Sequence, residues 1–262
     1  MIIILATIFF VFGLIIGSFL NVVIARINTE RSFGGRSACM SCQTRLHWYE
    51  LIPIFSFIAL SGRCRTCQTR ISIAYPLVEF LTGLIFAALF LKFQNIFFTN
   101  TLIFSFTYAY YVTAFSLLLV IAVYDLRHKI IPDTLSLVFG VFVFVGLFFF
   151  NSYGFSPHLP SILEFLSGLL IALPFYLFWL VSSGAWMGLG DAKLAIGLGW
   201  LLGLSRALSG VVIAFWIGAI IGLSLVIISA KHGMKSEIPF APYLVLGAFL
   251  AFLFSLSLFP LF

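Results

Sequence analysis

The chain has 262 residues, of which 63% are hydrophobic and only 8% are charged. Soluble domains carry about 25% charged residues, and the mean hydropathy of this chain is +1.20. These values exclude a soluble globular domain, a disordered chain and a secreted disulfide scaffold. One membrane helix needs about 20 residues, so the apolar residues are numerous enough for about eight spans.

The order of apolar segments predicts an all-α polytopic membrane protein with about eight transmembrane helices and both termini outside. The first segment has no cation before it and Arg26 just after it, which is the reverse of a cleavable signal peptide. We therefore expect its amino end outside and Arg26 inside. The predicted spans cover residues 2–24, 74–93, 101–124, 134–150, 162–182, 192–210, 211–230 and 239–262.

The basic residues support this orientation. Of the 14 lysines and arginines, all but Lys92 and Arg206 fall in the predicted inside loops, as expected for cytoplasmic loops. The cation excess therefore does not indicate a nucleic-acid partner. The weakest span is 192–210, because the residues between Lys193 and Arg206 extend only about 18 Å. We expect Arg206 to reach outward from this span.

Residues 26–73 form the long loop of the chain, and this loop holds all four cysteines. They form two C-x-x-C pairs, and the 21 residues between the pairs resemble the spacing of a zinc ribbon. Two such turns complete a tetrahedral thiolate site, and disulfides are disfavoured on the predicted cytoplasmic side. We therefore expect structural zinc, with a redox dithiol or free thiols as alternatives, at Cys39, Cys42, Cys64 and Cys67.

Two aspartates lie beside predicted spans on the cytoplasmic side. Asp125 follows the third span and Asp191 precedes the sixth, with two crossings between them. Two carboxylates held close share a proton, so one can deprotonate a water while the other protonates a carbonyl oxygen. The alternative is that each aspartate pairs with a nearby cation, Arg127 or Lys193, at a helix end.

Asp133 and Glu79 are the other acidic candidates. Asp133 precedes the fourth span, which predicts a helix N-cap, although it is also the rival of Asp125 in a catalytic pair. Glu79 lies about one turn inside the second span, where a charged group is costly, so it is a candidate functional residue. Gly188-Leu189-Gly190 lacks the third glycine and the preceding strand of a dinucleotide site.

Taken in order, these residues resemble the bifunctional prepilin peptidases, which are type IV leader peptidases that also N-methylate their product. The similarity extends over nearly the whole chain, although the G-x-G-D element alone is shared with presenilin-like proteases. Departures are Met40-Ser41, where the family usually has a proline, and Ala241, where it usually has glycine. The matching segments are Gly17-Ser18-Phe19-Leu20-Asn21-Val22-Val23, the paired C-x-x-C loop with Trp48-Tyr49-Glu50 and Ile52-Pro53, Tyr75-Pro76-Leu77-Val78-Glu79, Asp125 with Ile131-Pro132-Asp133, Gly188-Leu189-Gly190-Asp191-Ala192-Lys193-Leu194, and Ile238-Pro239-Phe240-Ala241-Pro242-Tyr243.

The resemblance implies an aspartic peptidase of the bacterial inner membrane, with Asp125 and Asp191 as the catalytic pair facing the cytoplasm. It implies removal of the short basic leader from prepilins or pseudopilins of type IV pili and type II secretion. The new amino terminus is then methylated from S-adenosylmethionine. Residues 1–100 correspond to the methyltransferase-associated region and 101–262 to the peptidase region. Glu79 is the single, weak candidate for contact with the methyl donor.

Two other classes of function remain open at this point. One is a presenilin-like intramembrane protease, which would cut within a transmembrane helix. The other is a non-enzymatic transporter or scaffold whose aspartates bind ions. The position of a cut distinguishes the two proteases, and cleavage as such distinguishes an enzyme from a transporter.

Overall fold

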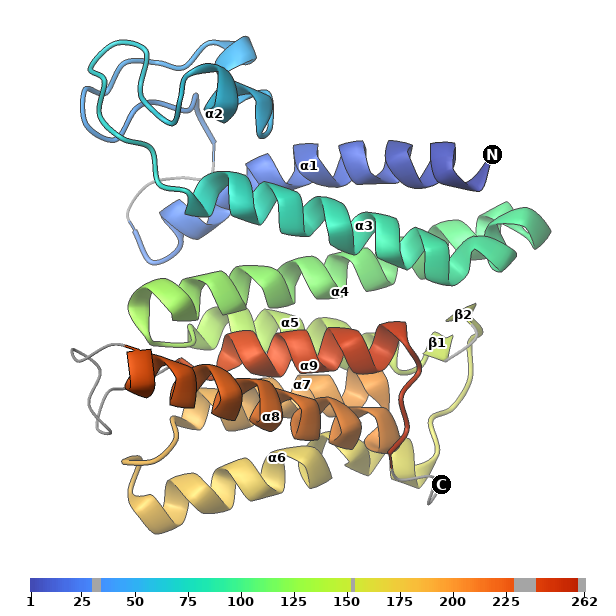
Figure 1. Ribbon diagram of the computed structural model, residues 1–262. Coiled ribbons are helices and arrows are strands. Elements are labelled where there is room, and N and C mark those ends of the chain that lie inside the picture. Colours follow the sequence, from blue (N-terminus) through green and yellow to red (C-terminus); the bar gives the residue numbers. More distant parts are fainter. Residues whose placement is uncertain (30–33, 152–153, 229–238, 259–262) are drawn as a thin grey trace. The chain divides into compact units, whose positions relative to one another are not determined.

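The computed structural model describes residues 1–29, 34–151, 154–228 and 239–258 of the chain. Arg31, Lys231, Lys235 and Ile238, which entered the sequence predictions, lie outside the described residues. The chain divides into two compact units, Met1–Asn95 and Ile96–Phe262. In both units most of the described residues are helical (Figure 1).

Unit 1 contains two long apolar helices that lie side by side (Figure 1). They are α1 (Ile2–Arg26) and α3 (Ala74–Thr99), whose last turn belongs to unit 2. The loop between them carries the 3-10 helix η1 (Trp48–Leu51) and the short helix α2 (Phe55–Ala59). The described part of the predicted cysteine loop therefore contains two short helical segments.

Glycines allow α1 and α3 to approach closely. A Cβ atom at Gly13 would lie 2.8 Å from the Cα of Gly83, and one at Gly17 would lie 2.7 Å from the Cα of Glu79. Small residues permit this kind of contact between membrane helices, where van der Waals packing drives association. The contact near Gly17 places Glu79 against the carboxyl-terminal half of α1, the half that ends at Arg26.

Unit 2 is a bundle of helices that run side by side (Figure 1). Contacts join α6 to α7, α8 to α9, α5 to α7 and α4 to α9, and α4 is buried along most of its length. A small antiparallel hairpin follows α5. The elements are α4 (Thr101–His128), α5 (Asp133–Gly146), β1 (Phe150–Asn151), β2 (Gly154–Phe155), α6 (Ile162–Ser182), α7 (Leu189–Leu202), α8 (Leu204–Ile228) and α9 (Ala241–Leu253).

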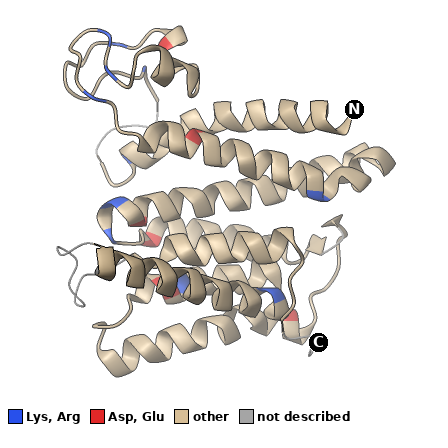
Figure 2. Cartoon of the chain, in the orientation of Figure 1, with Lys and Arg blue, Asp and Glu red and all other residues tan. Residues whose placement is uncertain are grey.

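Of the helices that the structure describes, α1, α3, α4, α6 and α8 are long and apolar enough to cross a membrane. The protein is therefore an all-α multi-pass membrane protein, and Figure 2 shows long stretches of these helices without charge. Helices α5, α7 and α9 have 14, 14 and 13 residues. They extend about 20 Å, which is less than the ~30 Å of a hydrocarbon core. Eight helices thus follow the predicted order, but three of them are too short for a straight full crossing.

The predicted spans 192–210 and 211–230 are misplaced. Helix α7 ends at Leu202 and α8 begins at Leu204, because Gly203 has φ +74°, a backbone conformation that ends a helix. Arg206 therefore lies in the first turn of α8 instead of inside the sixth span. The short distance between Lys193 and Arg206 is explained by this break.

The fourth predicted span, 134–150, is also too long at its end. Helix α5 stops at Gly146, and the following residues turn into the hairpin. Contacts with α4 hold this hairpin, since the Tyr111 hydroxyl donates to the Asn151 carbonyl at 3.3 Å. The Phe155 amide also donates to the Thr107 hydroxyl at 2.8 Å. These partners lie far away in the chain, so the apolar pattern carries no sign of them.

We predict that Gly199→Ala destabilises unit 2. A Cβ atom there would lie 2.6 Å from both the Gly168 Cα and the Ser167 carbonyl oxygen, so α6 and α7 would have to separate, at a cost of about 1–3 kcal/mol. Gly140→Ala is the matched control, because its Cβ would meet nothing within 4 Å. Thermal unfolding in detergent should show a lower midpoint for Gly199→Ala alone. Equal midpoints for the two variants would contradict the predicted contact.

Candidate active site and metal centre

Asp125 lies in the last turn of α4 and is 5% exposed. Its Oδ2 atom accepts a hydrogen bond at 3.2 Å from the backbone N–H of Ala241, the first residue of α9. A helix amino end carries partial positive charge and favours a carboxylate. The start of α9 therefore fixes the Asp125 side chain. Sequence reasoning did not identify this role of Ala241, whose only signal was its place in the Pro239–Tyr243 segment.

Asp191 lies in the first turn of α7 and is 8% exposed. Its Oδ1 atom is buried and has no hydrogen-bond partner among the described residues. The charge of Asp125 acts on Asp191, so the structure brings these two carboxylates within electrostatic reach of each other. Like charges at such positions resist simultaneous ionisation and favour a shared proton.

Gly190 allows the start of α7 to approach the segment that follows α4. A Cβ atom at Gly190 would lie 2.9 Å from the Cβ of Ile131. Any larger residue would push α7 away from this segment and would move Asp191 relative to Asp125. The glycine before the aspartate thus has a steric explanation within unit 2.

Asp133 does not cap α5, so the predicted N-cap is wrong. Pro132 occupies the cap position, and Asp133 is the first helical residue with a 75% exposed side chain. Its Oδ1 atom instead accepts from the Lys193 ammonium at 2.6 Å. The suggested pairing of Lys193 with Asp191 is therefore wrong as well. The ion pair joins the α4–α5 connection to α7 and leaves Asp191 without this cation.

The four cysteines of the loop form a compact cluster. Their Sγ atoms all lie within 4.8 Å of one another, with 3.8 Å between Cys39 and Cys67 and 4.0 Å between Cys42 and Cys64. A tetrahedral zinc ion with Zn–S bonds of about 2.3 Å places its sulfurs ~3.8 Å apart. All four residues are free thiols. The cluster therefore has the donor atoms and the size that one zinc ion requires.

The two cysteine turns are an internal repeat that sequence reasoning overlooked. Residues 39–45 and 64–70 share the pattern Cys-x-x-Cys-Gln-Thr-Arg. In each turn the glutamine has positive φ, +60° at Gln43 and +57° at Gln68. Each turn also closes with a backbone hydrogen bond from the first cysteine N–H to the threonine carbonyl, at 3.0 Å and 2.9 Å. The repeat builds two like turns that face one another across the cluster.

The threonines of this repeat favour the thiolate form that zinc binds. The Thr69 hydroxyl lies 3.2 Å from the Cys67 sulfur and, together with the Thr69 backbone, lowers the pKa of that thiol to about 6. Thr44 acts in the same way on Cys42 and lowers its pKa. Two of the four ligands thus have lowered pKa values before metal binds.

Comparisons with known proteins identify the family. Residues 11–93 match the bacterial peptidase A24 N-terminal domain, and residues 112–223 match the type IV leader peptidase family. The chain belongs to the type IV leader peptidase family. No solved structure is significantly similar to it.

Relatives of this chain named prepilin leader peptidase/N-methyltransferase include three that match over most of its length. The Bacillus subtilis protein is 32% identical over 257 residues, covering 96% of this chain and 95% of the relative. The Aeromonas salmonicida protein is 32% identical over 278 residues, covering 95% and 90%. The Myxococcus xanthus protein is 37% identical over 235 residues, covering 88% of this chain and 66% of the relative.

Glu79 connects the cysteine loop of this leader peptidase to α3. Its Oε2 atom accepts a hydrogen bond at 2.8 Å from the backbone N–H of Ile54. Ile54 has φ +58°, which is rare for a β-branched residue, so the contact supports a strained turn. The carboxylate of Glu79 is thus directed at the loop backbone.

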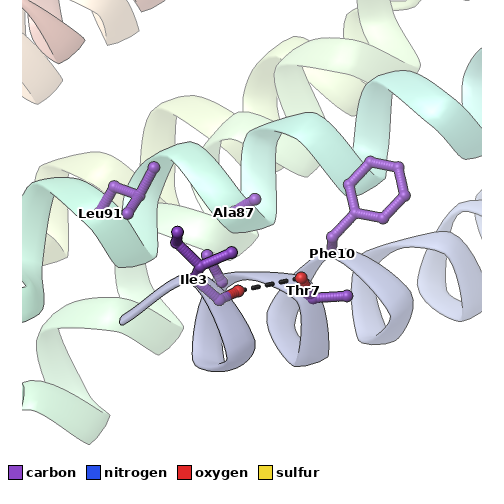
Figure 3. Close-up of a pocket in the computed structure, with 6 residues that line it drawn as sticks. Ile3, Thr7, Phe10, Ala87 and Leu91 are labelled. Atoms are coloured by element: carbon purple, nitrogen blue, oxygen red, sulfur yellow. Dashed lines mark hydrogen bonds between the residues drawn. The ribbon is translucent and has the colours of Figure 1, made fainter. Parts of the chain in front are cut away.

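The two long helices of unit 1 also line an open apolar cavity of about 330 Å³ (Figure 3). The one hydroxyl in its wall, that of Thr7, donates to the Ile3 carbonyl at 2.9 Å. The cavity therefore presents no polar group for chemistry. It is lined by Ile3, Ala6, Thr7, Phe10, Ala87 and Leu91.

Proposed function

We propose that this chain cleaves prepilin-type precursors at the cytoplasmic face of the bacterial inner membrane and methylates the new amino terminus. Its family and the names of its relatives support both reactions. The observation that carries the peptidase half is the buried pair Asp125 and Asp191, in which the charge of Asp125 acts on Asp191. Asp125 is a better candidate for this pair than Asp133, because Asp133 is exposed and held in an ion pair with Lys193.

The two carboxylates divide the chemistry of hydrolysis between them. With one proton shared, the ionised carboxylate takes a proton from a water, and the protonated one donates to the substrate carbonyl oxygen. The water oxygen bonds to the carbonyl carbon, and the C–N bond breaks as the leaving nitrogen takes a proton from the pair. The Ala241 N–H holds one oxygen of Asp125 in place. The Asp191 Oδ1 atom is oriented for substrate or water, since no described residue bonds to it.

We assign methyl transfer to residues 1–100 and cleavage to residues 101–262. Cys39, Cys42, Cys64 and Cys67 would hold a structural zinc ion, whose binding would supply most of the folding free energy of a loop too small for a core. S-adenosylmethionine supplies a methyl group that bonds to the lone pair of the new terminal amine, while the sulfur keeps the electrons of the broken bond and the amine loses a proton. The loop's part is to bind and orient the reactants.

The test is one incubation of the purified full chain in detergent with a precursor and methyl-labelled S-adenosylmethionine. We expect mass spectrometry to show a product shortened by its basic leader and heavier by one methyl group. A cut inside the transmembrane helix of the precursor would favour the presenilin-like alternative. An uncut precursor would favour the transporter or scaffold.

A further inference from the structure

The cysteine loop contains a second cavity, of about 400 Å³, whose walls are polar and aromatic. It lies in unit 1, outside the long apolar helices, and the peptidase chemistry does not use it. It presents two arginines, one carboxylate and two aromatic rings. The lining residues that carry this chemistry are Arg45, His47, Tyr49, Glu50 and Arg65.

One wall of this cavity is aromatic. The rings of His47 and Tyr49 are stacked, with centroids 5.2 Å apart and planes 5° from parallel. Tyr49 is 38% exposed, so part of its side-chain surface stays accessible to a ligand. A stacked pair of this kind suits a planar heteroaromatic ligand, because such rings gain from offset stacking as well as from area burial.

Two charged groups of the cavity, those of Arg65 and Glu50, are held in place by contacts within the loop. Arg65 donates to the Tyr49 hydroxyl at 2.7 Å, and its guanidinium carbon lies 5.6 Å from the Tyr49 ring centroid. Glu50 accepts from the His47 backbone N–H at 2.7 Å. A guanidinium has five N–H donors, so Arg65 retains donors for an anion. Groups that are ordered before binding lose less conformational entropy when a ligand arrives.

We propose that this cavity is the binding site for S-adenosylmethionine. The proposal rests on the methyl transfer proposed above. Arg45 and Arg65 supply the cations for the donor's carboxylate, and Glu50 supplies the anion for its ammonium and sulfonium groups. The stacked rings of His47 and Tyr49 receive the adenine. A volume of about 400 Å³ lies within the ~300–1,000 Å³ typical of small-molecule sites. The carboxylate and the aromatic wall together favour this zwitterion over a simple anion.

The internal repeat offers a matched control. Arg45 and Arg70 occupy the same position in the two cysteine turns, but of these two arginines Arg45 lines the cavity and Arg70 does not. We compare Arg45→Gln and Arg70→Gln in the purified full chain, loaded with zinc and held in detergent. The equilibrium dissociation constant for S-adenosylmethionine should rise about tenfold or more in Arg45→Gln, because a charge-assisted pair is lost. It should change less than about twofold in Arg70→Gln. Zinc content reports whether each loop is folded.

Hydrogen exchange of the wild-type chain gives a second readout that needs no variant. S-adenosylmethionine should slow exchange in peptides that cover residues 44–50 and 64–66. Protection confined to other segments would overturn the proposed site. Equal affinities of Arg45→Gln and Arg70→Gln would also overturn it, while a wild-type chain that still methylates would leave the proposed function standing. A wild-type chain that neither binds the donor nor methylates would overturn both.

Discussion

Asp125→Asn and Asp191→Asn should each reduce the rate of precursor cleavage by at least about 10³-fold. Hydrolysis by a carboxylate pair needs one ionised and one protonated group, so the loss of either carboxylate removes the mechanism. Asparagine keeps the shape of the side chain but has no titratable proton. Both residues are buried at helix ends, where asparagine fills the same space as aspartate. The substitution therefore removes the acid–base chemistry and keeps the packing. Single-turnover cleavage with normal amounts of folded protein is the measurement.

Asp133→Asn is the matched control for these variants. It removes an acid from the same α4–α5 segment, but this acid is exposed and ion-paired with Lys193. Exposed pairs contribute about 0–1 kcal/mol, so cleavage should change less than about fivefold. An inactive Asp133→Asn beside an active Asp125→Asn would mean that the pair contains Asp133. Activity in both Asp125→Asn and Asp191→Asn would contradict the aspartic mechanism.

The pH dependence of cleavage tests the same pair. Acid and base act together, so the rate should fall on both sides of an optimum. The two apparent pKa values that bound this optimum belong to the coupled pair and not to either residue. A sigmoidal profile with a single limit would indicate that one carboxylate is dispensable.

Cys64→Ser should remove the zinc ion and reduce methyl transfer at least about tenfold while cleavage persists. Cys64 is the most buried of the four cysteines, and three thiolates cannot complete the tetrahedral site. The loop lies in unit 1, whereas Asp125 and Asp191 both lie in unit 2. Metal analysis and the two product masses measure the three outcomes together. Ser41→Ala, between two cysteines of the same loop, is the control.

The acidity of Cys67 adds a pH test to this prediction. The pKa of its thiol is lowered from 9.0 to about 6, mainly by the Thr69 hydroxyl. Protons compete with zinc at Cys39, whose pKa is raised, already at higher pH, whereas they compete at Cys67 only as the pH falls through about 6. The decline of zinc affinity should therefore become steeper below about pH 6. Thr69→Val removes the hydroxyl, so the decline should begin at higher pH. If the Cys64→Ser chain keeps its zinc ion and its full rate of methyl transfer, the four cysteines do not form a zinc site that methyl transfer requires.

Several features of the protein are local in the chain, and the amino-acid sequence alone determined them. Apolar segments of about 20 residues predict membrane helices, because backbone hydrogen bonds must be satisfied inside lipid. Each cysteine pair forms one short turn, so its spacing alone indicates a metal site. An aspartate beside an apolar segment is costly and therefore conspicuous. These signals sufficed to find Asp125, Asp191 and the four cysteines.

Contacts between distant residues were decided only by the tertiary structure. Lys193 pairs with Asp133 across 60 positions, and the Ala241 amide reaches Asp125 across 116. Neither contact has a local signal, which is why Asp133 was mistaken for a helix cap. The break at Gly203 likewise depends on a positive φ that apolar composition does not reveal. The polar cavity beside the cysteine turns arises in the same way, because Arg65 and Tyr49 meet only after the loop folds.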